Sequence, residues 1–165
     1  MVLLALRSPG AGDMRRQTVA VSATPGIVRR ASEDDLDAVL EFERRDPAGR
    51  EYATLLATRV RSGEVLLFES SGRLLGYAVL RPTSFFDRDF VELLVVGAHD
   101  RRHGIGSLLL REAAAQSTTA RIFTSTNRSN TPMIRLLEQM SWRRSGELEG
   151  IDDGDPELVF FNDTS

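Results

Sequence analysis

Apolar positions along the chain follow two periods, and each period predicts one kind of element. Short runs in which most residues, or every second residue, are apolar predict strands. These runs are Ile27–Arg30, Val65–Glu69, Leu74–Leu80, Phe90–Val96, Arg121–Thr126, Trp142–Glu149 and Leu158–Phe161. Apolar residues spaced by three or four predict helices. One follows a cap at Ser32, one runs from Asp46-Pro47 to Gly63, and two more span Ser107–Ala115 and Thr131–Met140.

The order of these elements indicates the fold class. Two helices precede the central strands, and helices alternate with strands only in the second half of the chain. Ser70–Arg73 predicts a hairpin turn, and Pro82 is expected to close the second strand of that hairpin. The sequence therefore predicts a mixed α/β protein, with helices on both faces of one mixed sheet.

A single domain over residues 26–165 fits the length of the chain. Residues 1–25 are rich in Ser, Gly, Pro and Ala and show no period, so we expect a flexible extension. Its apolar run, Val2–Leu6, is too short to span a bilayer and follows no basic residue, which argues against a membrane anchor or a signal peptide. Met14 stays open as an alternative start.

Two absences exclude whole classes of chemistry. All 21 basic side chains are arginines, so a Walker A lysine and Schiff-base catalysis are excluded. Without cysteine, the chain has no disulfide, thiolate ligand or thiol nucleophile, which suits the cytoplasm. The two histidines are too few for a histidine-rich metal site, so no metal is expected. The net charge of −3 argues against a nucleic-acid partner, and we expect no membrane partner.

A glycine-containing turn follows the strand Phe90–Val96 and opens a helix. The first turn of a helix carries free backbone N–H groups and a partial positive charge. Gly104 and Gly106 would allow an anion to approach this backbone closely, so a diphosphate is a natural ligand. A plain structural turn explains the same fragment equally well. The dinucleotide fingerprint is not met, because Leu109 stands at its third glycine.

Two motifs together resemble those of the GNAT superfamily of acetyltransferases. Arg101-x-x-Gly104-x-Gly106, after an apolar strand, resembles the acetyl-CoA signature of that family. Downstream, Asn130 opens a helix that ends at Ser141-Trp142, which is similar to the family's Asn-led helix ending in Gly-Phe. The element order is also similar, from about Gly26 to Asn162.

This resemblance implies a fold and a cofactor site. The fold is that of acyl-CoA N-acyltransferases: a mostly antiparallel sheet of about six to seven strands with one splayed parallel pair, flanked by about four helices. Acetyl-CoA would bind as co-substrate where Phe90–Val96 and Arg121–Thr126 separate, with its pantetheine arm against the backbone of Val95 and Val96. The implied diphosphate contacts are Arg101, Arg102, His103, Gly104, Ile105, Gly106 and Ser107, and Asn130 would lie near the pantetheine or support the loop.

Of the residues that the resemblance implies, those for proton transfer are matched less fully than those for cofactor binding. The family often places a tyrosine, as acid for the departing thiolate, where this chain has Leu137. Glu92 is the candidate general base, because it interrupts an apolar strand and, by period-two alternation, shares a face with Leu94 and Val96. An ordinary salt-bridged glutamate is an equally good explanation of Glu92.

An acidic turn separates the last two strands. Asp152, Asp153, Asp155 and Glu157 lie close together in the sequence and could attract a cationic amine. A solvated hairpin turn explains the same residues more simply, given Gly154 and Pro156.

The predicted function is an acetyl-CoA-dependent N-acetyltransferase. A primary amine on a small molecule or a peptide would attack the thioester directly. One alternative is a catalytically weak acyl-CoA-binding regulatory module, which Leu137 favours. Another is a nucleotide-binding α/β protein, which the missing lysine and third glycine disfavour. Assembly as a homodimer is left open.

Overall fold

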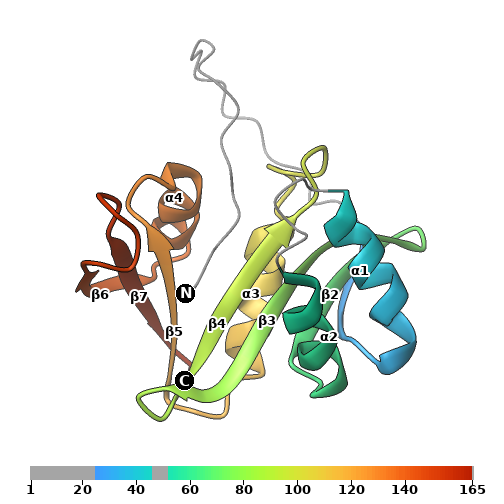
Figure 1. Cartoon of the computed structure of the whole chain (residues 1–165), viewed down its shortest axis with the longest axis horizontal. Helices are drawn as coiled ribbons and strands as arrows, with labels where there is room; N and C mark the ends of the chain where they lie inside the picture. Colours follow the sequence, from blue (N-terminus) through green and yellow to red (C-terminus); the bar gives the residue numbers. More distant parts are fainter. Residues whose placement is uncertain (1–24, 46–51, 165) are drawn as a thin grey trace.

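A computed structural model describes residues 25–45 and 52–164, which form one seven-stranded sheet (Figure 1). The strand order is β1-β2-β3-β4-β5-β7-β6, and only β4 and β5 pair in parallel. The strands are β1 (Ile27–Arg30), β2 (Val65–Ser70), β3 (Arg73–Phe85), β4 (Arg88–Val96), β5 (Arg121–Asn127), β6 (Arg143–Leu148) and β7 (Glu157–Asp163).

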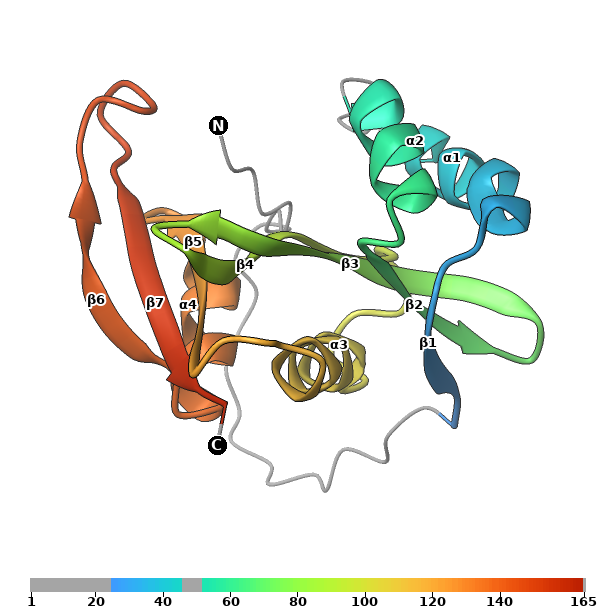
Figure 2. The same ribbon diagram turned by 90° about the horizontal axis from the view of Figure 1, so that it is seen from below.

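Helices cover both faces of the sheet, as the order of elements predicts. Figure 2 shows α1 and α2 on one side of the sheet and α3 and α4 on the other. Their bounds are α1 (Leu36–Arg44), α2 (Ala53–Arg61), α3 (Ile105–Ala115) and α4 (Thr131–Gln139), with the short 3-10 helix η1 (Glu33–Asp35) before α1. The mixed α/β fold with one parallel pair is confirmed.

Two apolar clusters fill the spaces between these layers. One joins α3 and α4 to the sheet through residues such as Leu94, Leu109 and Leu137, all fully buried. The other joins α1 and α2 to the opposite face through residues such as Val39, Leu56 and Tyr77. Because successive residues of a strand point to opposite faces, both clusters draw on the same central strands.

Some expected boundaries differ from those observed. Pro82 does not close β3, which continues to Phe85, because Pro82 lies in a register irregularity between Arg81 and Phe85 where no ladder N–H is required. The helix expected from Ser107 begins earlier, at Ile105. The Asp46-Pro47 helix start and all but the last residue of the expected extension lie outside the described residues.

Candidate active site

The parallel strands β4 and β5 separate part-way along their length. Their pairing covers only Asp89–Val91 against Ile122–Thr124. Beyond it, β5 stays paired with β7 as far as Asn127, and β4 stays paired with β3 as far as Val96. At the last paired position the Thr124 hydroxyl donates to the Val91 carbonyl oxygen at 3.0 Å, which closes the ladder. Within the described residues, no strand pairs with the β5-facing edge of 92–96.

This free edge is where the chain can accept a further extended segment. Its backbone N–H and C=O groups need partners, and an extended ligand can supply them as an added strand would. Val95 and Val96 lie on this edge with nearly buried side chains, so their backbone is the part that a ligand can reach.

A β-bulge moves Glu92 away from its predicted face. Val79 lies opposite Leu93 but Leu80 lies opposite Val91, so Glu92 is an extra residue on β4. Leu94 and Val96 belong to the cluster under α3 and α4, whereas Glu92 contacts Arg59 of α2. The predicted shared face of Glu92, Leu94 and Val96 is therefore wrong, because the bulge shifts the alternation by one residue.

Two arginines hold the Glu92 carboxylate. Arg59 donates from Nε to one carboxylate oxygen at 2.9 Å, and Arg81 donates from Nη1 to the other at 3.0 Å. Arg59 also forms an ion pair with Glu64 at 3.2 Å. Glu92 thus lies just past the point where β4 and β5 separate, with both oxygens accepting hydrogen bonds from guanidinium groups.

The loop 97–104 leads from the end of β4 to the N-terminus of α3. Gly104 is its N-cap, with a left-handed φ of 80°, and its carbonyl accepts from the Leu108 N–H at 3.1 Å. No side chain of the described residues caps this end. The N–H groups of Ile105, Gly106 and Ser107 belong to the first turn, where a helix offers no acceptor. The site therefore presents backbone donors and the positive end of the helix dipole to an anion.

The two glycines of the motif act differently. A Cβ on Gly104 would meet nothing within 4 Å, so Gly104 is required by its positive φ and by the open space above it. A Cβ on Gly106 would lie 3.1 Å from the Leu136 side chain, so Gly106 lets α3 approach α4 closely.

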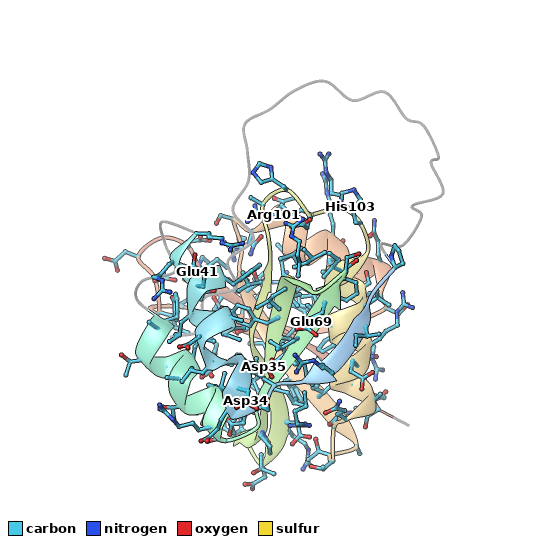
Figure 3. All side chains as sticks on the ribbon, turned by 90° about the vertical axis from the view of Figure 1, so that its right-hand side faces the viewer. Asp34, Asp35, Glu41, Glu69, Arg101 and His103 are labelled. Atoms are coloured by element: carbon cyan, nitrogen blue, oxygen red, sulfur yellow. The ribbon has the colours of Figure 1, made fainter. Side chains whose placement is uncertain are left out.

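The loop between β4 and α3 is braced by its own residues. The Gly97 N–H donates to the Leu75 carbonyl at 2.9 Å, and the Arg101 Nε donates to the Val96 carbonyl at 3.2 Å. Arg102 adopts a positive φ of 64° and is exposed, as is His103. Figure 3 shows Arg101 and His103 at one end of the molecule, far from Asp34 and Asp35 at the other. The loop thus brings positive and polar groups to the helix start.

The α4 motif residues have structural contacts. The Asn130 side chain caps α4 by accepting from the Met133 N–H at 3.3 Å. Leu137 is fully buried in the core, so the tyrosine position of the family carries no hydroxyl here. Of the two tyrosines, Tyr77 is buried and donates to Glu43. None of these contacts supplies an acid for a departing thiolate.

Sequence reasoning missed Asp89, at the start of the parallel pair. This buried carboxylate accepts hydrogen bonds from the Thr83 N–H at 2.9 Å, the Thr118 N–H at 2.7 Å and the Ser117 hydroxyl at 2.9 Å. Burial alone would raise the pKa of Asp89, but these hydrogen bonds outweigh it and lower the pKa. Asp89 therefore joins the β3–β4 turn to the segment before β5. The sequence signal that could have pointed to Asp89 was an aspartate next to an apolar strand.

Comparison with known proteins agrees with this geometry. The model of the acetyltransferase (GNAT) family matches residues 30–142, more than half of the chain. The chain belongs to the GNAT family. No curated protein sequence matches it.

Several solved GNAT structures are similar. A GNAT-family acetyltransferase from Bacillus cereus is 31% identical, with a TM-score of 0.79, over 84% of this chain and 97% of that one. Arabidopsis thaliana NAA60 in complex with acetyl-CoA is 18% identical, with a TM-score of 0.70, over 84% and 99%. Diaminobutyrate acetyltransferase EctA from Paenibacillus lautus, in complex with L-2,4-diaminobutyric acid and coenzyme A, is 21% identical, with a TM-score of 0.62, over 84% and 95%.

Two further findings concern the described part of the GNAT chain. None of its helices is long and apolar enough to cross a membrane. No group of three or more His, Asp or Glu side chains there is arranged to hold a metal ion.

Proposed function

We propose that this GNAT protein transfers the acetyl group of acetyl-CoA to a primary amine on a small molecule or a peptide. One observation carries the proposal. The free edge of 92–96 leads through the loop 97–104 to the start of α3, which has no side-chain cap, so one continuous segment offers a strand edge and backbone donors for an anion. A pantetheine arm followed by a diphosphate has the matching chemistry.

The cofactor-binding roles follow from this arrangement. The backbone of Val95 and Val96 pairs with the pantetheine arm, and one of those N–H groups polarises the thioester carbonyl. The backbone from Arg102 to Ser107 holds the diphosphate, Arg101 braces the loop, and Asn130 fixes the start of α4 beside it. The acetyl-CoA-bound NAA60 structure supports the choice of this cofactor.

The chemical step needs a neutral amine. Its nitrogen attacks the thioester carbonyl carbon, the C–S bond breaks, the amine loses a proton and the thiolate gains one. An alkyl amine has a reference pKa of about 10.4, so a proton acceptor assists near neutral pH. We propose Glu92 for this role, acting directly or through a water after one guanidinium hydrogen bond is released. With Leu137 in the core, we propose water as the proton donor to the thiolate.

Measuring the release of free CoA with a panel of amines tests the function. Saturable, amine-dependent release together with acetyl-CoA binding is the expected result. Tight acetyl-CoA binding without release on any amine would instead support the regulatory module, which the buried Leu137 favours. The cytoplasmic location and a homodimer stay predictions from the sequence.

A further inference from the structure

Glu157, the first residue of β7, faces the same side of the sheet as Glu92. Its neighbours Leu158 and Phe160 lie in the cluster under α3 and α4, so alternation directs Glu157 to the other face. On β4 the same face carries Glu92, which is held by Arg59 of α2. Figure 2 shows α2 on this side of the sheet over the end that holds β2 and β3, opposite to α3 and α4. Glu157 pairs across the ladder with Asn127, at the open end of β5.

The Glu157 carboxylate is buried and has no charged partner among the described residues. Glu157 is 1% exposed, and neither carboxylate oxygen accepts a hydrogen bond from a donor among the described residues. Burial raises the pKa of Glu157, and the nearby Ser125 hydroxyl offsets only part of this shift. A buried carboxylate without a partner is costly, so its presence calls for a ligand or another compensating group.

Two more carboxylates near Glu157 are paired only with neutral groups. The Asn127 amide donates to Asp152 at 2.8 Å, and the Ser129 hydroxyl donates to Asp155 at 2.6 Å. The nearby Arg128 is engaged by Glu147 instead. In the described part of the chain, no arginine forms an ion pair with Asp152, Asp155 or Glu157, so three carboxylates at this end of the sheet lack a direct basic partner there.

We propose that Glu157, with Asp152 and Asp155 around it, binds a second cationic group of the acceptor, so that the preferred acceptors are diamines or related polycations. The inference rests on the proposed function. The carboxylates near the strand junction then differ in use. Glu92 and Glu64 form ion pairs with arginines of the chain, whereas Glu157 and its neighbours Asp152 and Asp155 would bind a cation of the substrate. An ammonium group would satisfy the buried carboxylate through a charge-assisted hydrogen bond.

The geometry sets the length of such an acceptor. The β4–β5 pairing ends at Thr124, and Glu157 lies opposite Asn127, three residues further along β5. Glu92, the proposed base, directly follows Val91, the β4 partner of Thr124, so the amine that it deprotonates would lie near this point. At about 3.3 Å per residue, three residues of β5 separate this point from Glu157 by roughly 10 Å, which a chain of about five to seven atoms between two nitrogens can span.

Matched amines test this inference. CoA release is measured with 1,5-diaminopentane and with 1-aminopentane, which differ only in the distal ammonium. We expect the wild-type protein to prefer the diamine in kcat/KM by about 10-fold or more. In Glu157→Gln the KM for the diamine should rise until the preference disappears, while kcat/KM for the monoamine stays within about twofold. Asp153→Asn, in the same turn but exposed, is the matched control and should keep the preference.

Several outcomes would overturn the inference. Equal kcat/KM for the two amines in the wild-type protein would do so, as would an unchanged preference in Glu157→Gln. A melting temperature that Mg²⁺ raises in the wild-type protein but not in Glu157→Gln would assign the site to a metal instead. If no amine is acetylated at all, the proposed function fails. The inference is then decided by calorimetric binding of 1,5-diaminopentane to the CoA-saturated protein, which must be lost in Glu157→Gln and retained in Asp153→Asn.

Discussion

The carboxylates on the two sides of the β4–β5 junction differ in how far their charge is neutralised. On the β4 side, Glu92 is held by Arg59 and Arg81, and the proposed anion site at the start of α3 consists of backbone N–H groups. On the β5 side, Glu157 is buried, and no basic side chain of the described residues pairs with it. A site for a cofactor that is always the same can be built from backbone N–H groups, and the carboxylate near it can be neutralised by arginines of the chain. A site that binds a charged acceptor through an ion pair needs a side chain whose charge is not neutralised within the protein, and burying such a charge costs stability.

The strongest change to the cofactor side is Gly104→Glu. A glutamate would bring a like charge beside the diphosphate and would strain a backbone with a φ of 80°. We expect acetyl-CoA affinity to fall by about 100-fold or more, measured by calorimetry. Gly104→Ala carries only the strain and should cost about 10-fold at most. Unchanged affinity in Gly104→Glu would mean that the diphosphate does not bind at the start of α3.

Asp89→Asn tests the junction between the two sides. The amide cannot accept all the hydrogen bonds that the Asp89 carboxylate accepts, so we expect unfolding to become easier by about 2 kcal/mol in urea titrations. Because folding lowers the pKa of Asp89, its stabilisation is complete above about pH 4 and is lost as the pH falls through the folded pKa. The difference between wild type and variant should therefore shrink only in acid. A constant difference down to pH 2 would contradict this.

Glu92→Gln tests the proposed base. We expect kcat to fall by about 10-fold or more, with acetyl-CoA affinity unchanged, because the side chain lies past the strand junction and away from α3. Glu64→Gln also removes an ion pair of Arg59 but leaves β4 intact, so it is the control for loss of structure. Identical pH profiles of turnover in wild type and Glu92→Gln would remove Glu92 from the role.

The smallest expected effect is a gain in stability on the acceptor side. Glu157→Gln replaces a buried charge without a partner, so the free energy of unfolding at pH 7 should rise by about 1 kcal/mol. Since folding raises the pKa of Glu157, the penalty is present above the folded pKa and vanishes as the pH falls toward about 4. Asp153→Asn should show neither effect. A destabilised Glu157→Gln would mean that the carboxylate has a structural partner.

The turn that carries the proposed cofactor motif could be predicted from the sequence. The positions from Arg101 to Gly106 lie where a strand passes into a helix, and both the local period and the glycines are visible in one short segment. The role of Gly106 could not be predicted, because its contact with Leu136 joins two helices far apart in the chain.

The sequence by itself determined the elements, their order, the absence of lysine and cysteine chemistry and the glycine turn that opens α3. These features are given by the residue types themselves or depend on neighbours within a few residues. Only the tertiary structure decided which charges meet. One extra residue at the bulge turned Glu92 away from the face of Leu94 and onto Arg59, 33 positions earlier. The pairing of β7 with β5 buried Glu157 beside Asn127, where sequence reasoning preferred a solvated turn. Burial and charge pairing are set by residues distant in the chain, and no local pattern records them.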